Sequence, residues 1–89
     1  MREINRTSNF KRDTKRIFRG AYDVSELLDV ISELQKGNTL APKFQDHALT
    51  GKMKGFRECH IRPDWLLMYR FEKNKIILVR TGSHAELFG

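Results

Sequence analysis

The chain has 89 residues, with 17 Lys and Arg residues against 11 Asp and Glu residues and a formal net charge of +6 at pH 7. This length fits one small domain (residues 1–89), and no apolar run approaches the roughly 18 residues needed to cross a membrane. A single cysteine, Cys59, excludes an intramolecular disulfide, and no apolar signal segment is visible near the start, so we expect a cytoplasmic protein.

The charges are distributed unevenly along the chain. Residues 1–20 contain seven Lys or Arg residues and two acids, whereas residues 21–41 contain four acids and one lysine. A basic surface beside a separate acidic one favours a polyanion such as nucleic acid as a partner, although many small basic proteins bind none.

The first 20 residues predict an edge strand over 2–6 and then a helix. Ser8 can cap this helix, and Phe10, Ile17 and Phe18 share one of its faces before Gly20 ends it. Its other sides are basic, which suits either a solvated surface or contact with an RNA backbone. The candidate RNA contacts on this helix are Lys11, Arg12, Lys15 and Arg16.

A second helix is predicted from Asp23, its N-cap, to Lys36, with Gly37 as its stop. Its outer face is acidic and should repel phosphate. The connection over 20–22 is short, so the two helices should be antiparallel neighbours. Its predicted apolar stripe consists of Val24, Leu27, Leu28, Ile31 and Leu34.

Residues 42–55 show neither a helical nor a strand period. A long irregular segment in so small a domain is more often functional than idle. It contains His47 and the lysines Lys52 and Lys54, which are candidates for chemistry and RNA binding.

Three strands are predicted after this loop. Residues 56–61 alternate, with Cys59 and Ile61 on the buried side, and residues 65–71 and 76–81 are apolar on both faces. Ser83 and Glu86 have capping-box spacing, so the last residues should form one helical turn that places Leu87 and Phe88 against the sheet. The predicted fold class is α+β, with two N-terminal helices on one face of a small, mainly antiparallel sheet.

Polar residues at the strand ends suit acid–base chemistry. Histidine moves protons near neutral pH, and arginine matches phosphate in geometry and charge. The three histidines match no short zinc motif, and Cys59 lacks an activating partner, so we expect neither a metal, another cofactor nor cysteine catalysis. A metal-free ribonuclease fits, although three unrelated surface histidines remain an alternative.

Three motifs carry a family resemblance. They are Asp46-His47 with Leu49 and Gly51, then His60 with Pro63-Asp64-Trp65, and finally Arg80 with Gly82-Ser83-His84 and Leu87-Phe88. In this order and spacing, across nearly the whole chain, the sequence resembles the YafQ branch of the RelE/ParE toxins of bacterial type II toxin–antitoxin systems. Met53 departs from the tryptophan common at its position, which puts base stacking there in doubt.

The resemblance implies a RelE-like fold and a ribosome-dependent mRNA endoribonuclease that acts through the ribose 2′-OH. It implies catalytic roles for His47, His60, Asp64 and His84, with His84 as acid and Asp64 or His47 as base. Arg80 would stabilise phosphate and Phe88 would place the mRNA; we add Trp65 as a candidate RNA contact. The implied partners are a cognate antitoxin, mRNA, the decoding site of the small ribosomal subunit, and operator DNA bound only by the toxin–antitoxin complex; no membrane is expected.

Two other functions remain open at this point. A basic helix alone would suffice for an RNA- or ribosome-binding module without catalysis. A gyrase-inhibiting toxin of the ParE branch would share the fold but would not need this set of histidines and aspartate.

Overall fold

The computed structural model describes all 89 residues of the chain. The elements are β1 (Glu3–Arg6), α1 (Ser8–Ile17), α2 (Val24–Lys36), η1 (Pro42–Phe44), β2 (His47–Ala48), η2 (Gly51–Met53), β3 (Arg57–Arg62), β4 (Trp65–Glu72), β5 (Lys75–Gly82) and α3 (His84–Phe88). No helix is both long enough and apolar enough to span a membrane.

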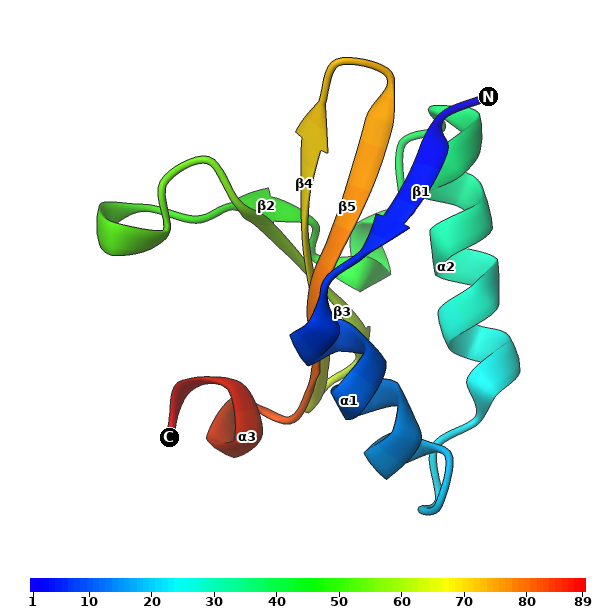
Figure 1. Cartoon of the computed structure of the whole chain (residues 1–89), viewed down its shortest axis with the longest axis vertical. Helices are drawn as coiled ribbons and strands as arrows, with labels where there is room; N and C mark the ends of the chain where they lie inside the picture. Colours follow the sequence, from blue (N-terminus) through cyan, green and yellow to red (C-terminus); the bar gives the residue numbers. More distant parts are fainter.

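The five strands form one sheet in the order β1-β5-β4-β3-β2. All neighbours are antiparallel except β1, which runs parallel to β5. In Figure 1, α1 and α2 lie to one side of this sheet, while α3 and the loop that carries η2 extend to the other. The predicted α+β class, with two helices on one face of a mainly antiparallel sheet, is confirmed.

The core lies between the helices and one face of the sheet. Alternate residues of β4, namely Trp65, Leu67 and Tyr69, join Cys59 and Ile61 of β3 in a single apolar cluster with the helices. From α2 the cluster receives Leu27, Val30, Ile31 and Leu34. The prediction for Leu28 was wrong, since its side chain faces outward and is 58% exposed. Phe18, predicted on the same helix face as Phe10 and Ile17, is the C-cap of α1 and is 54% exposed, whereas the other two are buried.

Helix α1 covers the edge of β5 beyond the end of β1. Thr7, rather than the predicted Ser8, is the N-cap: its hydroxyl accepts from the N–H of Phe10 and donates to the carbonyl of Val79. Further along, Asp13 accepts from the N–H of Thr81, and Arg16 donates to the carbonyl of Thr81. Side chains of α1 thus satisfy backbone groups that a longer β1 would otherwise pair.

The segments after α2 and after β5 differ from prediction in detail. The loop over residues 42–55, predicted to be irregular, contains two short 3₁₀ turns and the two-residue strand β2, which pairs with β3. The capping box of Ser83 and Glu86 is present as predicted. Phe88, however, is 52% exposed rather than buried against the sheet. In Figure 1 the short helix α3 that ends with it extends away from the sheet.

Candidate active site

Two histidines and a glutamate meet on the sheet face opposite the helices. Cys59 and Ile61 of β3 point into the core, so Glu58 and His60 point to the other side, as strand alternation requires. Residue pairing between β2 and β3 places His47 beside Glu58. The Glu58 side chain is only 7% exposed, whereas that of His47 is 48% exposed.

Both imidazoles turn the same nitrogen towards Glu58. Nδ1 of His47 lies 2.6 Å from the carbonyl of Gln45, and Nδ1 of His60 lies 3.2 Å from the carbonyl of Pro63. A carbonyl only accepts, so both Nδ1 atoms carry hydrogen. The Nε2 atoms then hold the lone pairs of the neutral rings, 3.8 Å and 3.7 Å from Oε1 of Glu58. The two lone pairs and the carboxylate of Glu58 therefore face one another.

His84 is held by Asp64 across the mouth of the site. Oδ1 of Asp64 accepts both from the backbone N–H of His84, at 3.0 Å, and from its ring Nδ1, at 2.7 Å. These hydrogen bonds lower the pKa of Asp64 below its usual value, the backbone bond contributing most. Asp64 therefore stays ionised near neutral pH and orients the His84 ring, whose Nε2 has no hydrogen-bond partner within the chain.

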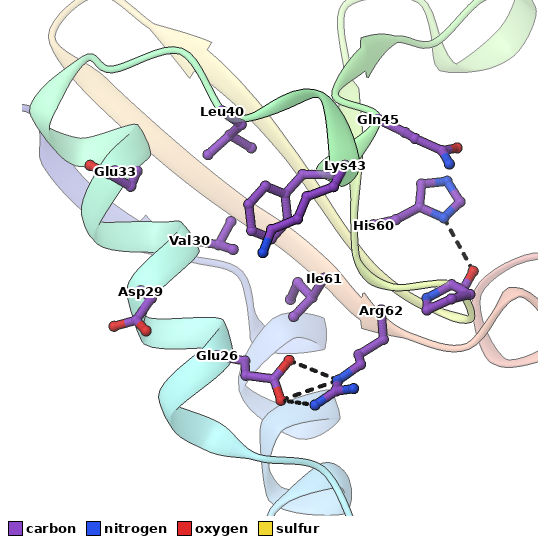
Figure 2. A pocket seen from close by; sticks show the side chains of 12 residues that line it. Glu26, Asp29, Val30, Glu33, Leu40, Lys43, Gln45, His60, Ile61 and Arg62 are labelled. Atoms are coloured by element: carbon purple, nitrogen blue, oxygen red, sulfur yellow. Dashed lines mark hydrogen bonds and ion pairs between the residues drawn. The ribbon is translucent and has the colours of Figure 1, made fainter.

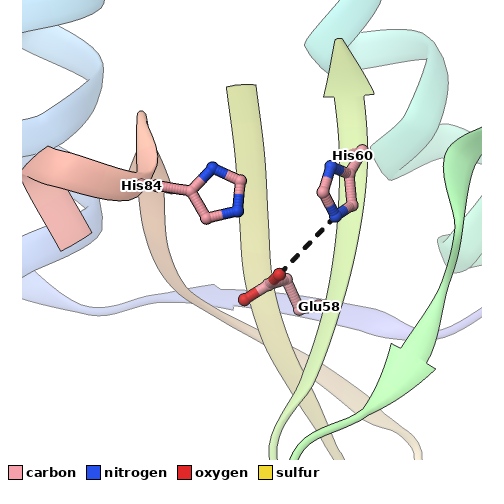
Figure 3. Close-up of side chains that lie close together, drawn as sticks. All are labelled: Glu58, His60 and His84. Carbon is pink, nitrogen blue, oxygen red and sulfur yellow. Dashed lines mark ion pairs between the residues drawn. The ribbon is translucent and has the colours of Figure 1, made fainter. Parts of the chain in front are cut away.

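The three imidazoles lie in a row. Ring centroids are 6.3 Å apart between His47 and His60 and 5.6 Å apart between His60 and His84. Figure 3 shows His60 and His84 on either side of the Glu58 carboxylate. Ligand atoms of Glu58, His60 and His84 lie within 4.8 Å of one another, and imidazole with carboxylate is a donor set that suits transition metals. The sequence analysis, which expected no metal, did not single out this donor set.

Arg80 is partly occupied by a structural ion pair. Its Nε and Nη2 donate to the buried carboxylate of Asp13 at 2.6 and 3.1 Å, which raises the pKa of Arg80. Its side chain is still 28% exposed, and Nη1 has no protein partner. Of the Arg80 guanidinium, only the Nη1 amino group is therefore free to make the predicted phosphate contact, because Nε and Nη2 are bonded to Asp13.

Two predicted RNA contacts are placed differently by the structure. Trp65 is 2% exposed, its indole N–H donates to Thr81, and its ring meets Tyr22 edge-on, so it cannot stack on a base. The prediction for Trp65 was wrong because an apolar aromatic after a turn can equally begin a buried strand. Arg16 is bound to Asp13, Thr81 and Glu86.

The other predicted RNA contacts are on the surface. The side chains of Lys52 and Lys54 lie on the η2 loop, and Phe88 lies at the end of α3. The three remaining exposed cations of α1 are Lys11, Arg12 and Lys15.

Several polar groups near the site are structural. Asp46, the neighbour of His47, turns away and accepts from Arg57 and from the hydroxyl of Tyr69. Cys59 is fully buried, and burial raises the pKa of its thiol to about 12, so it is not a nucleophile. Glu58 was missed by the sequence analysis, although its i, i+2 spacing from His60 already placed both on one strand face.

A groove of about 830 Å³ separates α2 from η1 and β3. Figure 2 shows its apolar floor and the carboxylates of α2 along one wall, with His60 at the far end. The wall residues are Glu26, Asp29 and Glu33, and Glu26 is paired with Arg62. A wall of carboxylates disfavours the binding of phosphate, so this groove does not suit a polyanion.

Fold and site together define a class of small toxin. The structure superposes on a copper-bound mutant toxin from Helicobacter pylori with a TM-score of 0.95 and 46% identity, over 99% of this chain and 100% of that one. It also superposes on a metal-bound Helicobacter pylori toxin with a TM-score of 0.93 and 43% identity, over 99% and 100% of the two chains. For the Escherichia coli DinJ–YafQ complex the TM-score is 0.91 and the identity 32%, with both chains covered in full.

Sequence comparison narrows the class to one family. The chain is 33% identical to the mRNA interferase toxin YafQ of Escherichia coli K12 over 89 residues, which cover 99% of this chain and 97% of that protein. The family model described as "Bacterial toxin of type II toxin-antitoxin system, YafQ" matches residues 2–89. The chain belongs to this family of toxins, and the predicted resemblance is confirmed.

Proposed function

We propose that this protein is an mRNA endoribonuclease that cleaves RNA on the ribosome by acid–base chemistry at the ribose 2′-OH. The observation that carries the proposal is the row of three imidazoles, with Glu58 between two of them and Asp64 bonded to the third. Its relative from Escherichia coli is an mRNA interferase by name, which supports the same reaction class here.

His84 is the proposed general acid. Asp64 accepts the Nδ1 hydrogen of the ring and so holds the ring in place, and an imidazolium in this position has a second hydrogen on Nε2 to donate. The 53% exposure of the His84 side chain allows that nitrogen to reach the departing 5′-oxygen. Asp64, proposed above as a possible base, is better suited to orienting His84, as the aspartate of a catalytic triad does.

The proposed base is the cluster of His47, Glu58 and His60 acting as a unit. Two imidazole lone pairs face one carboxylate, and each of these groups can accept a proton. Of the three groups, His47 is the most exposed and is the one that would take the proton from the 2′-OH.

Three cations and one exposed aromatic ring are the proposed RNA contacts. The free Nη1 of Arg80 would stabilise charge on the phosphorane, with Lys52 and Lys54 contributing from the η2 loop. Phe88, exposed at the end of α3, would stack on a base of the mRNA.

The proposed partners follow from the family. Because the YafQ relative is found in a DinJ–YafQ toxin–antitoxin complex, a cognate antitoxin is proposed to neutralise this protein. The decoding site of the small subunit would present the mRNA, and operator DNA would be bound only by the toxin–antitoxin complex.

Metal binding is a second property that the donor set favours. Glu58, His60 and His84 would hold a transition metal ion, as the Helicobacter pylori toxins hold metal or copper. Coordination would use the imidazole lone pairs that the acid–base reaction needs, so the bound metal would inhibit cleavage rather than assist it.

The experiment strips metal from the purified protein with EDTA, removes the chelator, adds the protein to translating ribosomes in magnesium buffer and maps the mRNA 3′ ends. Wild type should leave 2′,3′-cyclic or 3′-phosphate ends, and only when ribosomes are present. His84→Ala should lower the cleavage rate by about 100-fold or more, and Asp64→Asn by about 10-fold, since general acid catalysis contributes roughly 100- to 10,000-fold.

The controls separate the competing functions. Full activity of His84→Ala would remove that residue from the reaction. Ribosome binding without any cleavage by wild type would support a binding module, and inhibition of DNA gyrase without cleavage would support the ParE-like alternative. Loss of activity in the metal-stripped protein, restored by adding a transition metal to it, would contradict the metal-free mechanism.

A further inference from the structure

The helix that carries His84 has little apolar support. α3 is five residues long, none of them is buried, and none belongs to the core cluster. Its main neighbour is the end of β5. Since few apolar contacts hold α3, polar contacts must set the direction in which it leaves the sheet.

Glu86 joins α3 to its own N-terminus and to α1 at the same time. Its Oε1 accepts from the N–H of Ser83 at 2.8 Å, and its N–H donates to the Ser83 hydroxyl at 3.1 Å, which completes the capping box. Its Oε2 is 2.7 Å from Nε of Arg16. One carboxylate therefore links the residue before His84 to a helix on the far side of β5.

Arg16 is itself anchored at two further points. Nη1 donates to Asp13 at 3.1 Å, and Nη2 donates to the carbonyl of Thr81 at 3.2 Å. With Nε in an ion pair with Glu86, each nitrogen of the guanidinium has a protein partner. A planar guanidinium held in this way fixes the orientation of the groups that it joins.

Gly82 passes directly under this ion pair. A Cβ at this position would lie 2.7 Å from Nη2 of Arg16 and 2.8 Å from Oε1 of Glu86, and φ is +153°. Only glycine lets the backbone approach the pair so closely. The turn from β5 into α3 is thus built around the contact between Arg16 and Glu86.

We infer that Arg16 and Glu86 form a latch that positions His84 for catalysis. Arg16, predicted from the sequence to bind RNA, is then a positioning residue that acts through Glu86 and Ser83. The inference rests on the proposed function, because it takes His84 as the proton donor. Asp64 orients the ring of His84, while the latch orients the helix on which that ring is mounted.

The test compares Arg16→Met, Glu86→Gln and the double variant. Methionine keeps the length and helix propensity of the side chain without its charge, and glutamine can still serve in a capping box. Each variant should lower the maximal cleavage rate on ribosomes by about 10- to 100-fold, the range expected for misplaced catalytic groups, with little change in KM. The double variant should be no worse than the worse single one, since both remove the same contact.

Arg12→Met provides the matched contrast on the same helix. Arg12 is exposed and bonded only to Asn9, so as an RNA contact it should affect KM rather than the maximal rate. If Arg16→Met behaves like Arg12→Met, with a raised KM and a normal rate, Arg16 is a phosphate contact and the latch is refuted.

A second measurement needs no RNA. Amide hydrogen exchange at Leu87 and Gly89, whose N–H groups bond within α3, should be faster in both latch variants while exchange at Leu67 in β4 stays unchanged. Unchanged exchange in α3 would overturn the latch even if the rate falls. If the wild-type protein cleaves no mRNA, the proposed function is wrong. Hydrogen exchange would still show whether the contact between Arg16 and Glu86 holds α3 in place.

Discussion

Four hydrogen bonds converge on the carboxylate of Asp13. Two come from Arg80, one from Arg16 and one from the backbone N–H of Thr81. Burial alone would raise the pKa of Asp13, but these bonds, that from Arg80 first, hold it below its ordinary value. The ionised form is therefore favoured by folding, even though the residue is 3% exposed.

Replacing this residue should weaken the fold. We expect Asp13→Asn to lower the free energy of unfolding by about 2 to 4 kcal/mol at pH 7, because charge-assisted bonds are lost and two arginines lose their partner. The lower end is favoured because both arginines reach solvent. Urea unfolding of the two proteins measures the difference.

The pH dependence gives an independent check on the same carboxylate. A depressed folded pKa contributes stability above the unfolded value of 3.8, and this contribution is lost as pH falls through the folded value. The difference between wild type and Asp13→Asn should therefore be constant from pH 5 to 7 and shrink below pH 3.8. Asp29→Asn, at an exposed acid without a hydrogen-bonded partner, should show neither effect.

Individual residues also show which contacts could be predicted from the sequence and which could not. The sequence places His60, Asp64 and His84 at one end of the sheet, because strands joined by short turns pair side by side and bring their ends together. Arg80 could not be recognised as the partner of Asp13, which is 67 residues away, and nothing local distinguishes a paired arginine from a free one. Trp65 looks the same in sequence whether its ring is buried or exposed.

The amphipathic helix α2 offers a direct comparison of two adjacent leucines. Leu27 is 2% exposed in the core, and Leu28 is 58% exposed. Leu27→Ala should destabilise the protein by about 2 to 5 kcal/mol, the cost of a cavity in a packed core. Leu28→Ala should change stability by less than about 0.5 kcal/mol, as surface substitutions do. Thermal unfolding distinguishes the two, and equal losses would contradict the observed orientation of α2.

Helices and strands with a strong hydrophobic period could be predicted from the sequence, whereas elements without such a period could not. α2 and the β4–β5 hairpin follow from apolar patterns several residues long. β2 has two residues, too few for any period, and forms only because β3 offers it an edge. The strand β2, which brings His47 to Glu58, therefore depends on its tertiary contact with β3. For this reason the position of the loop over residues 42–55 could not be predicted from the sequence.

The charge of the whole molecule should govern its affinity for RNA. The basic residues of α1 and the η2 loop are exposed, and the acids of α2 line a separate groove. We expect ribosome binding to weaken as salt rises, because each phosphate contact releases counterions and contributes roughly 0.7 to 0.9 to the logarithmic slope.

Substitution identifies which cations are responsible. Replacing Lys11, Arg12 and Lys15 with glutamine should reduce that slope by about 2, the sum for three contacts of roughly 0.7 each. Lys36→Gln, at the end of the acidic helix, should leave it unchanged. An affinity independent of salt in the wild-type protein would exclude phosphate contacts as the main source of binding.

The parallel pairing of β1 with β5 joins the beginning of the chain to its end. β5 spans Lys75–Gly82 of 89 residues and lies between β1 and β4. β1 therefore has no pairing partner, and α1 has no strand edge to cover, until β5 has formed. We expect β1 and α1 to dock late in folding, because the strand that they contact is far from them in the sequence and such non-local contacts form slowly.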